Sequence, residues 1–207
     1  MRIRTRTLSL VGSALLICAF TAGPSFSQAP APNVQNPMGA KAAPGSMPSM
    51  QAQLLSKIHQ INQLEIKAGR LAQKNSSNFK VRAFGRRLVI DHSAADRKVL
   101  HFARANHIVL MTPQPQNAQQ QQQMQNTMAT MQRLQTLKGN AFDMQFLQFM
   151  QKGHDNAIQM LAQKEKMLPP SGLKSMIKDM IPILTQHYEI AVNLKIRDTA
   201  GGMAGGY

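Results

Sequence analysis

Four side chains that can bind a metal ion or exchange a proton interrupt the apolar stripes of four separate helical patterns. They are Glu65, His92, His154 and His187. A polar or charged group on an apolar stripe costs free energy unless it has a partner, so we expect the four to face one another. Three imidazoles and one carboxylate form a ligand set suited to Zn²⁺, Cu²⁺ or Fe²⁺. The pattern therefore predicts a central metal or small-ligand site.

Two aspartates extend this candidate site. Asp91 and Asp143 are candidates for additional ligands or for outer groups that orient the histidines. Asp91 also lies four residues after Arg87, a spacing that forms surface ion pairs on helices. The alternative interpretation of the whole set is structural: a hydrogen-bonded core network in which Glu65 is ionised against a protonated histidine.

Hydrophobic periodicity predicts the four helices that carry these residues, over residues 50–74, 79–106, 140–167 and 173–197. In each of them apolar residues recur at steps of three and four, which places them on one face. The inward stripes are Leu54, Ile58, Ile61, Glu65, Ala68 and Ala72; Val81, Leu88, His92, Ala95, Val99 and Phe102; Asp143, Leu147, Met150, His154, Ala157 and Leu161; and Met176, Met180, Ile183, His187, Ile190 and Leu194.

The lengths of the connections predict how the helices are joined. The first and last pairs are linked by segments of about four residues, so each pair forms an antiparallel hairpin. Residues 111–123 include the run Gln119–Gln123 and are expected to form a long, poorly ordered crossover. A short helix through Met124 then covers one end of the bundle. The order of a hairpin, a Gln-rich crossover and a second hairpin predicts an all-α fold. We expect a ferritin-like antiparallel four-helix bundle over residues 51–198.

The rise per residue of an α-helix indicates whether the four inward residues lie at the same depth along the bundle axis. Counted from the first turn, Glu65 and His92 differ by about 6 Å along the axis at ~1.5 Å per residue. Counted from the second turn, His154 and His187 differ by about 3 Å. The four side chains are therefore expected to converge near the middle of the bundle.

The chain begins with the features of an export signal. Arginines at positions 2, 4 and 6 precede an apolar run from Leu8 to Phe20, which is short for a membrane span. Residues 1–27 are predicted to be a cleaved signal peptide and 28–50 a flexible linker, and residues 199–207 a flexible Gly-rich tail. The mature chain would have no transmembrane span and would be periplasmic or secreted. Cleavage also removes Cys18, the sole cysteine, and with it any thiol chemistry.

The net charge of the chain indicates which kinds of partner it is expected to bind. Lys and Arg number 24 against 9 acidic residues; removal of the leader takes away three arginines and leaves a net charge of +12. Such a protein associates with anionic cell-envelope components, through an outer face with Arg82, Arg86, Arg97 and Arg104. Nucleic acid is not an expected partner, because the sequence has few aromatic residues and is exported. No Gly-rich phosphate loop and no Gly-x-Ser-x-Gly motif occurs.

Several short segments resemble, in their order and spacing, the exported ferritin-like bundles of domain of unknown function 4142. The matching residues are Leu64–Ile66 with Gly69, Leu71 and Ala72; Val81–Phe84 and Val89–His92; Ala141–Asp143 with Gly153 and His154; and Ile181–Leu184 with His187 and Ala191. The resemblance covers about residues 50–195. It implies a four-helix ferritin-like fold and an exported location, and it implies no established activity.

Three hypotheses about function follow. The first is a non-catalytic exported bundle that binds a metal ion or small ligand at the central Glu/His site. The second is an envelope interaction protein whose basic surface docks on anionic polymers or a partner, with purely structural polar residues in the core. The third, an oxidoreductase, has the least support, because the Glu-x-x-His pair of di-iron carboxylate bundles is absent from the sequence.

Overall fold

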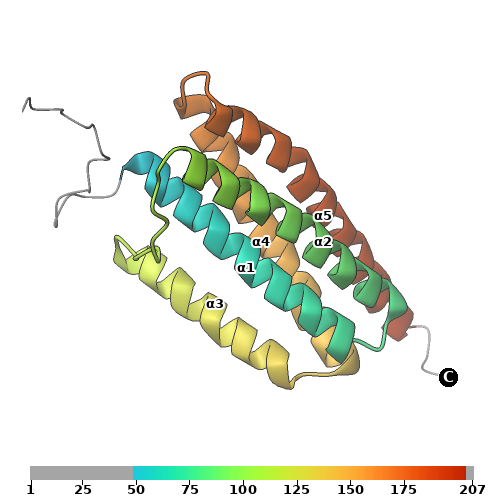
Figure 1. Cartoon of the computed structure of the whole chain (residues 1–207). Helices are drawn as coiled ribbons and strands as arrows, with labels where there is room; N and C mark the ends of the chain where they lie inside the picture. Colours follow the sequence, from blue (N-terminus) through green and yellow to red (C-terminus); the bar gives the residue numbers. More distant parts are fainter. Residues whose placement is uncertain (1–48, 204–207) are drawn as a thin grey trace, which may run out of the picture. The chain divides into compact units, whose positions relative to one another are not determined.

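The computed structural model describes residues 49–203, with side chains as far as residue 195, and within that range it contains five α-helices and no strand (Figure 1). They are α1 (Met50–Asn75), α2 (Phe79–Ala105), α3 (Ala118–Thr136), α4 (Gly139–Met167) and α5 (Gly172–Met203). The prediction of an all-helical fold is confirmed. The expected signal peptide and residues 28–48 of the expected linker lie outside the described residues.

Polar side chains cap the N-termini of three helices and so determine the residue at which each begins. Ser49 accepts a hydrogen bond from the amide of Ala52 and so caps α1, with an N–O distance of 3.1 Å. Asn78 caps α2 by accepting from the amide of Lys80, and Asn117 caps α3 in the same way. Such caps satisfy amides that have no partner inside the helix, which is why the helices begin where they do.

Helices α1 and α2 form a tight antiparallel hairpin, joined by the three residues 76–78 (Figure 1). Gly69 on α1 and Gly85 on α2 face each other across a close approach of the two helices. A Cβ atom built on Gly69 would lie 2.6 Å from the carbonyl oxygen of Gly85, and one on Gly85 would lie 2.7 Å from the Cβ of Ala72. Any side chain at either glycine would therefore force the two backbones apart.

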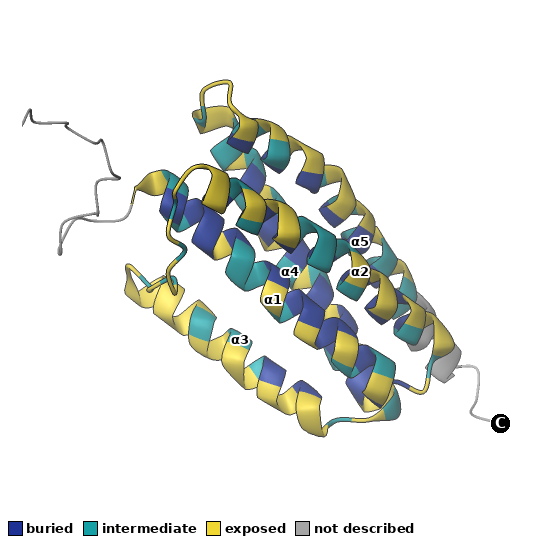
Figure 2. Ribbon diagram, viewed as in Figure 1, coloured by how far each residue is buried: buried dark blue, intermediate teal, exposed yellow. Residues whose placement is uncertain are grey.

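Helices α4 and α5 form the second hairpin, and the two hairpins pack together through contacts of α1 with α4 and of α2 with α5. The buried residues of all four helices turn toward the interior (Figure 2). They form two hydrophobic clusters. The first contains Leu88, Phe142, Phe146 and Met150, and the second contains Leu54, Ile58, Val99, Leu161 and Ile177.

Helix α5 buries a different stripe from the expected one. Ile183 was expected to face inward, but it is 41% exposed, and Leu184 is buried in its place. The buried residues of α5 up to residue 195, where the description of side chains ends, are Leu173, Ile177, Met180, Leu184, His187 and Ala191. This series also has steps of three and four, so the sequence allows either stripe, and packing against the other hairpin decides between them. The helix runs on to Met203, past the predicted helix end at residue 197.

The crossover contains a helix that is longer than expected. The glutamine run, expected to be poorly ordered, belongs to α3, which begins at Ala118 and lies alongside α1 (Figure 1). Only Met131 and Leu134 are buried on this helix. The amide of the Asn75 side chain donates a hydrogen bond to the carbonyl oxygen of Leu134, at 2.9 Å, and so fastens α3 to the end of α1.

None of the helices within residues 49–203 has both the length and the hydrophobicity that a membrane span requires.

Candidate metal centre

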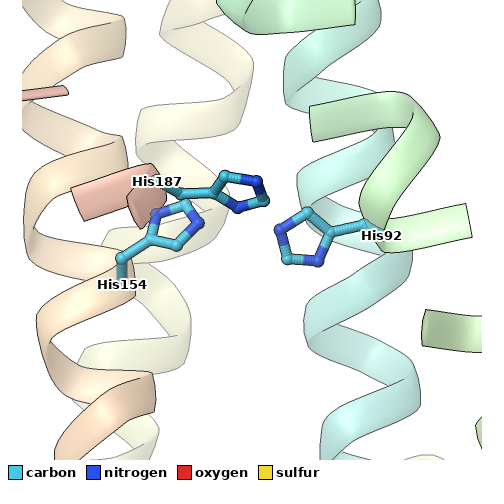
Figure 3. Close-up of side chains that lie close together, drawn as sticks. All are labelled: His92, His154 and His187. Carbon is cyan, nitrogen blue, oxygen red and sulfur yellow. The ribbon is translucent and has the colours of Figure 1, made fainter. Parts of the chain in front are cut away.

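Three of the predicted site residues meet inside the protein. His92, His154 and His187 come from α2, α4 and α5, and one ring nitrogen of each lies within 4.8 Å of the other two. The three residues are 3%, 1% and 0% exposed. Their ring centroids are 5.2–5.7 Å apart, and each ring turns a nitrogen toward the space between them (Figure 3). We refer to these three residues as the histidine group.

The histidine group lies in a polar layer between the two hydrophobic clusters. On α2, His92 is flanked by Leu88 of the first cluster and Val99 of the second, and His154 on α4 is flanked in the same way. On α5 the order is reversed, because that helix runs in the opposite direction. The helices therefore hold the imidazoles at one level with apolar packing above and below.

Each imidazole uses one nitrogen in a hydrogen bond to an acceptor. His92 Nδ1 donates to Asn62 Oδ1 at 2.9 Å, and His154 Nδ1 donates to the carbonyl oxygen of Met150 at 2.8 Å. His187 Nε2 donates to Asp91 Oδ2 at 2.9 Å. These acceptors fix the tautomers, because the nitrogen beside each of them must carry the hydrogen.

The remaining nitrogen of each ring consequently presents a lone pair. These atoms are His92 Nε2, His154 Nε2 and His187 Nδ1, and each is buried with no hydrogen-bond partner among the described residues. A buried polar atom without a partner costs about 1–3 kcal/mol. Three of them on neighbouring rings form a convergent set of electron-pair donors that nothing in the described protein satisfies.

Burial also favours the uncharged form of two of these rings, His92 and His187. It lowers the pKa of His92 well below its usual value, with smaller contributions from the neighbouring His154 and His187. Burial lowers the pKa of His187 to about 4, although the hydrogen bond to Asp91 acts in the opposite direction. Both rings are therefore neutral at pH 7, and neutral imidazole is the form that binds metal ions.

The spacing of the histidine group is close to that of a metal-bound set. With Zn–N bonds of 2.0–2.1 Å, tetrahedral coordination places the nitrogens about 3.4 Å apart. The three nitrogens lie within 4.8 Å of one another, so a contraction of about 1.4 Å or less would complete the geometry.

Glu65 is buried near the histidine group but is not part of it. It is 4% exposed, and its Oε2 has no hydrogen-bond partner in the described part of the chain. Its Oε1 lies 3.3 Å from the position that a Cβ would take on Gly153, the residue before His154. Burial raises the pKa of Glu65, and the electrostatic interaction with His154 acts in the opposite direction. The missing side chain at Gly153 thus makes room for the carboxylate beside α4.

The two aspartates take different positions. Asp91 contacts the histidine group directly through His187 and also accepts from Arg87 Nε at 3.2 Å, so it forms both the expected surface ion pair and a bridge to the buried ring. Asp143 is buried on α4, eleven residues before His154, which corresponds to about 16 Å along the helix axis. It therefore lies at a different level from the histidine group.

Two polar contacts were not anticipated from the sequence. Asn62, which orients His92, lies one turn before Glu65 on α1, and that i,i+3 spacing is the signal that could have identified it. His59 lies outside the apolar stripe predicted for residues 50–74. It contacts the buried Asp96, with 2.7 Å between Nδ1 and Oδ1, and Gln63 donates to the other carboxylate oxygen.

The arginines of the expected basic face do not all face solvent freely. Arg82 donates hydrogen bonds to the carbonyl oxygens of Ser76 and Ser77 and so ties down the turn between α1 and α2. Arg86, Arg97 and Arg104 are exposed. Three of the four arginines of the expected basic face are therefore exposed.

Comparisons with known proteins agree with this architecture. The crystal structure of the putative secreted protein DUF305 from Streptomyces coelicolor is similar, with a TM-score of 0.58 and 13% identity over 72% of this chain and 93% of that one. No curated protein sequence matches. The family model of domain of unknown function 4142 (DUF4142) matches residues 36–194, a range that includes all three residues of the histidine group. The chain therefore belongs to the DUF4142 family.

Proposed function

We propose that this protein is an exported, non-catalytic, ferritin-like four-helix bundle that binds one divalent transition-metal ion through His92, His154 and His187. The observation that carries the proposal is the convergence of three buried ring nitrogens that have lone pairs and no partner. A purely structural histidine is usually satisfied at both nitrogens when it is buried. Here each ring has an engaged nitrogen and an open one, which is the pattern of a metal-binding imidazole with its outer partner.

The ligand set favours Zn²⁺, Cu²⁺ or Fe²⁺ over the hard cations. Imidazole nitrogen binds these three ions well, whereas Mg²⁺ and Ca²⁺ prefer oxygen. Three protein nitrogens leave a further coordination position, as in many zinc sites. We assign Glu65 to the vicinity of the metal, where its carboxylate would offset part of the ion's charge.

The surrounding architecture supports the remaining parts of the proposal. Helices α1, α2, α4 and α5 form two hairpins and α3 lies in the connection between them, an order that supports the proposal of a ferritin-like bundle. Export is supported by the leader-like N-terminus and by the similarity to a protein named as secreted. Binding is favoured over oxidase chemistry because the chain has no Glu-x-x-His pair with which to hold two iron ions.

The decisive experiment is a metal analysis of the untagged protein, since a polyhistidine tag would itself bind the ions. The purified protein is incubated separately with Zn²⁺, Cu²⁺ and Fe²⁺, freed of loose metal by gel filtration, and analysed by mass spectrometry for bound metal. We expect one ion per chain for at least one of the three metals.

The matched variants are His154→Ala and His101→Ala. His101 is an exposed histidine on α2 and should retain the full metal content when it is replaced, whereas His154→Ala should lose at least nine-tenths of it. Less than 0.2 ion per chain with all three metals, or equal metal content in both variants, would refute the proposed function.

A further inference from the structure

A small cavity adjoins the histidine group. It has a volume of about 40 Å³ and is bounded by residues of α1, α2, α4 and α5, including His92 and His187 at one end. The rest of its wall is mainly apolar and includes Ala95 and Ala157. His154 is not among the lining residues, so the cavity approaches the histidine group from one side.

The volume of the cavity limits what it can hold. One water molecule requires roughly 10–15 Å³ of such space, so 40 Å³ accommodates about three waters. A bound molecule would therefore have about three to five non-hydrogen atoms. Sugars, nucleotides and lipids are too large for the cavity.

The polar groups of the wall indicate the chemistry of the occupant. Asn62 lines the cavity, and its Nδ2 is a buried donor without a hydrogen-bond partner within the described residues. Asp91 is the acidic residue in the wall, but its carboxylate already accepts from His187 and Arg87. A metal dication held by neutral imidazoles would therefore face, on the side of the cavity, no negative charge that is not already paired. A buried charge requires a counter-charge.

We propose that the cavity is the binding site for a small monoanion that coordinates the metal ion at its open position and accepts a hydrogen bond from Asn62. This inference rests on the proposed metal site, because without the ion the anion would have no cationic partner there. The apolar remainder of the wall selects against multiply charged oxyanions such as phosphate, which would lose their hydration without gaining partners. Linear triatomic anions such as azide match both the size and the charge.

The test uses protein loaded with Co²⁺, whose visible absorption reports its ligands. Azide and phosphate are titrated separately, and the cobalt content of each sample is measured. We expect azide to change the cobalt bands saturably and with a 1:1 stoichiometry, and phosphate at the same concentrations to leave them unchanged.

Two neighbouring alanines on α2 provide matched variants. Ala95 lines the cavity and Ala94 does not, although both are partly buried. Ala95→Leu should fill the cavity and weaken azide binding at least tenfold, and Ala94→Leu should bind azide as the parent does. Ala157→Val fills the cavity from α4 and replaces Ala95→Leu if that variant fails to fold.

The outcomes separate the two proposals. If cobalt is bound at one ion per chain and azide leaves its spectrum unchanged, or acts equally on Ala95→Leu, Ala157→Val and Ala94→Leu, the cavity inference is overturned and the metal site stands. If no cobalt is bound under conditions in which Zn²⁺, Cu²⁺ and Fe²⁺ are also not bound, both proposals fail.

Discussion

Asp91 Oδ2 lies 2.9 Å from His187 Nε2 and joins α2 to α5 at the edge of the histidine group. The same carboxylate accepts from Arg87 on the outer side. Asp91 therefore links Arg87 at the surface to a fully buried imidazole. It holds the hydrogen of His187 on Nε2 and leaves Nδ1 as an electron-pair donor.

Replacing this carboxylate should weaken metal binding without unfolding the protein. In Asp91→Asn the amide group can donate to His187 Nε2, which would move the ring hydrogen to Nδ1 and block the lone pair. Loss of an outer partner of a metal-binding histidine typically costs about 10–100-fold in affinity. Competition titrations with a zinc chelator measure the change.

The control for this prediction is Asp96→Asn. Asp96 is also an aspartate of α2 that contacts a histidine, but its partner is His59, which is not part of the histidine group. Its replacement should leave zinc affinity within about twofold of the parent. Equal losses in the two variants would indicate a general effect on the fold.

Stability should fall when the metal-free protein is acidified. Burial lowers the pKa of His187 from 6.5 to about 4, so the unfolded chain binds the proton more tightly than the folded one. The contribution of this residue is fully present above about pH 6.5 and is lost as the pH falls toward 4. The shift corresponds to a decrease of about 3 kcal/mol in the free energy of unfolding.

Urea unfolding in the presence of EDTA, at pH 7 and at pH 4.5, measures this decrease. His187→Gln keeps a side chain that can donate to Asp91 but removes the titrating group, so its stability should depend less steeply on pH. A variant with the same slope as the parent would show that other groups cause the acid sensitivity.

The close approach of α1 and α2 should not tolerate a methyl group. In Gly85→Ala the new Cβ would lie 2.7 Å from both the Cβ of Ala72 and the carbonyl oxygen of Gly69. Overpacking of this kind costs about 1–3 kcal/mol, which exceeds the gain of up to about 1 kcal/mol from replacing a helical glycine. Thermal unfolding should therefore show a lower Tm.

Gly172→Ala is the comparison for this prediction. Its Cβ would meet the edge of the Phe102 ring at 3.2 Å, a contact that a side-chain movement can relieve. Its Tm should stay close to that of the parent. If Gly85→Ala is at least as stable as Gly172→Ala, the two helices separate more easily than the structure indicates.

The attachment of α3 should depend on one apolar side chain. Leu134 is fully buried, whereas Met128 on the same helix is 60% exposed. Leu134→Ala should cost about 2–5 kcal/mol because it leaves a cavity, and Met128→Ala should change stability by less than about 0.5 kcal/mol. Limited proteolysis should cut α3 faster only in the first variant; equal rates would contradict this account.

The sequence by itself determined that the chain is helical and which face of most helices is buried. Apolar residues at steps of three and four specify a face regardless of the partner, which is why His92, His154 and His187 could be identified as inward residues. The short turns likewise indicated the two hairpins, because so few residues allow little other than an antiparallel return.

Other features depend on how the helices pack against one another. Ile183 and Leu184 belong to alternative stripes that the periodicity of α5 allows equally, and contact with the second cluster selected Leu184. Polar composition suggested a loose glutamine run, but burial of Met131 and Leu134 supports a helix through it. Helical propensity and the local sequence pattern give no information about these contacts between helices.

The details of the candidate site were decided only by the tertiary structure. Which ring nitrogen is engaged depends on Asn62 from α1, on Asp91 from α2 and on the carbonyl oxygen of Met150. Two of these three contacts join separate helices, and their formation depends on axial register and rotation at the level of about an ångström. Periodicity specifies a direction around each helix, whereas hydrogen bonds and ligand geometry require distances between helices, and those arise only when the core is packed.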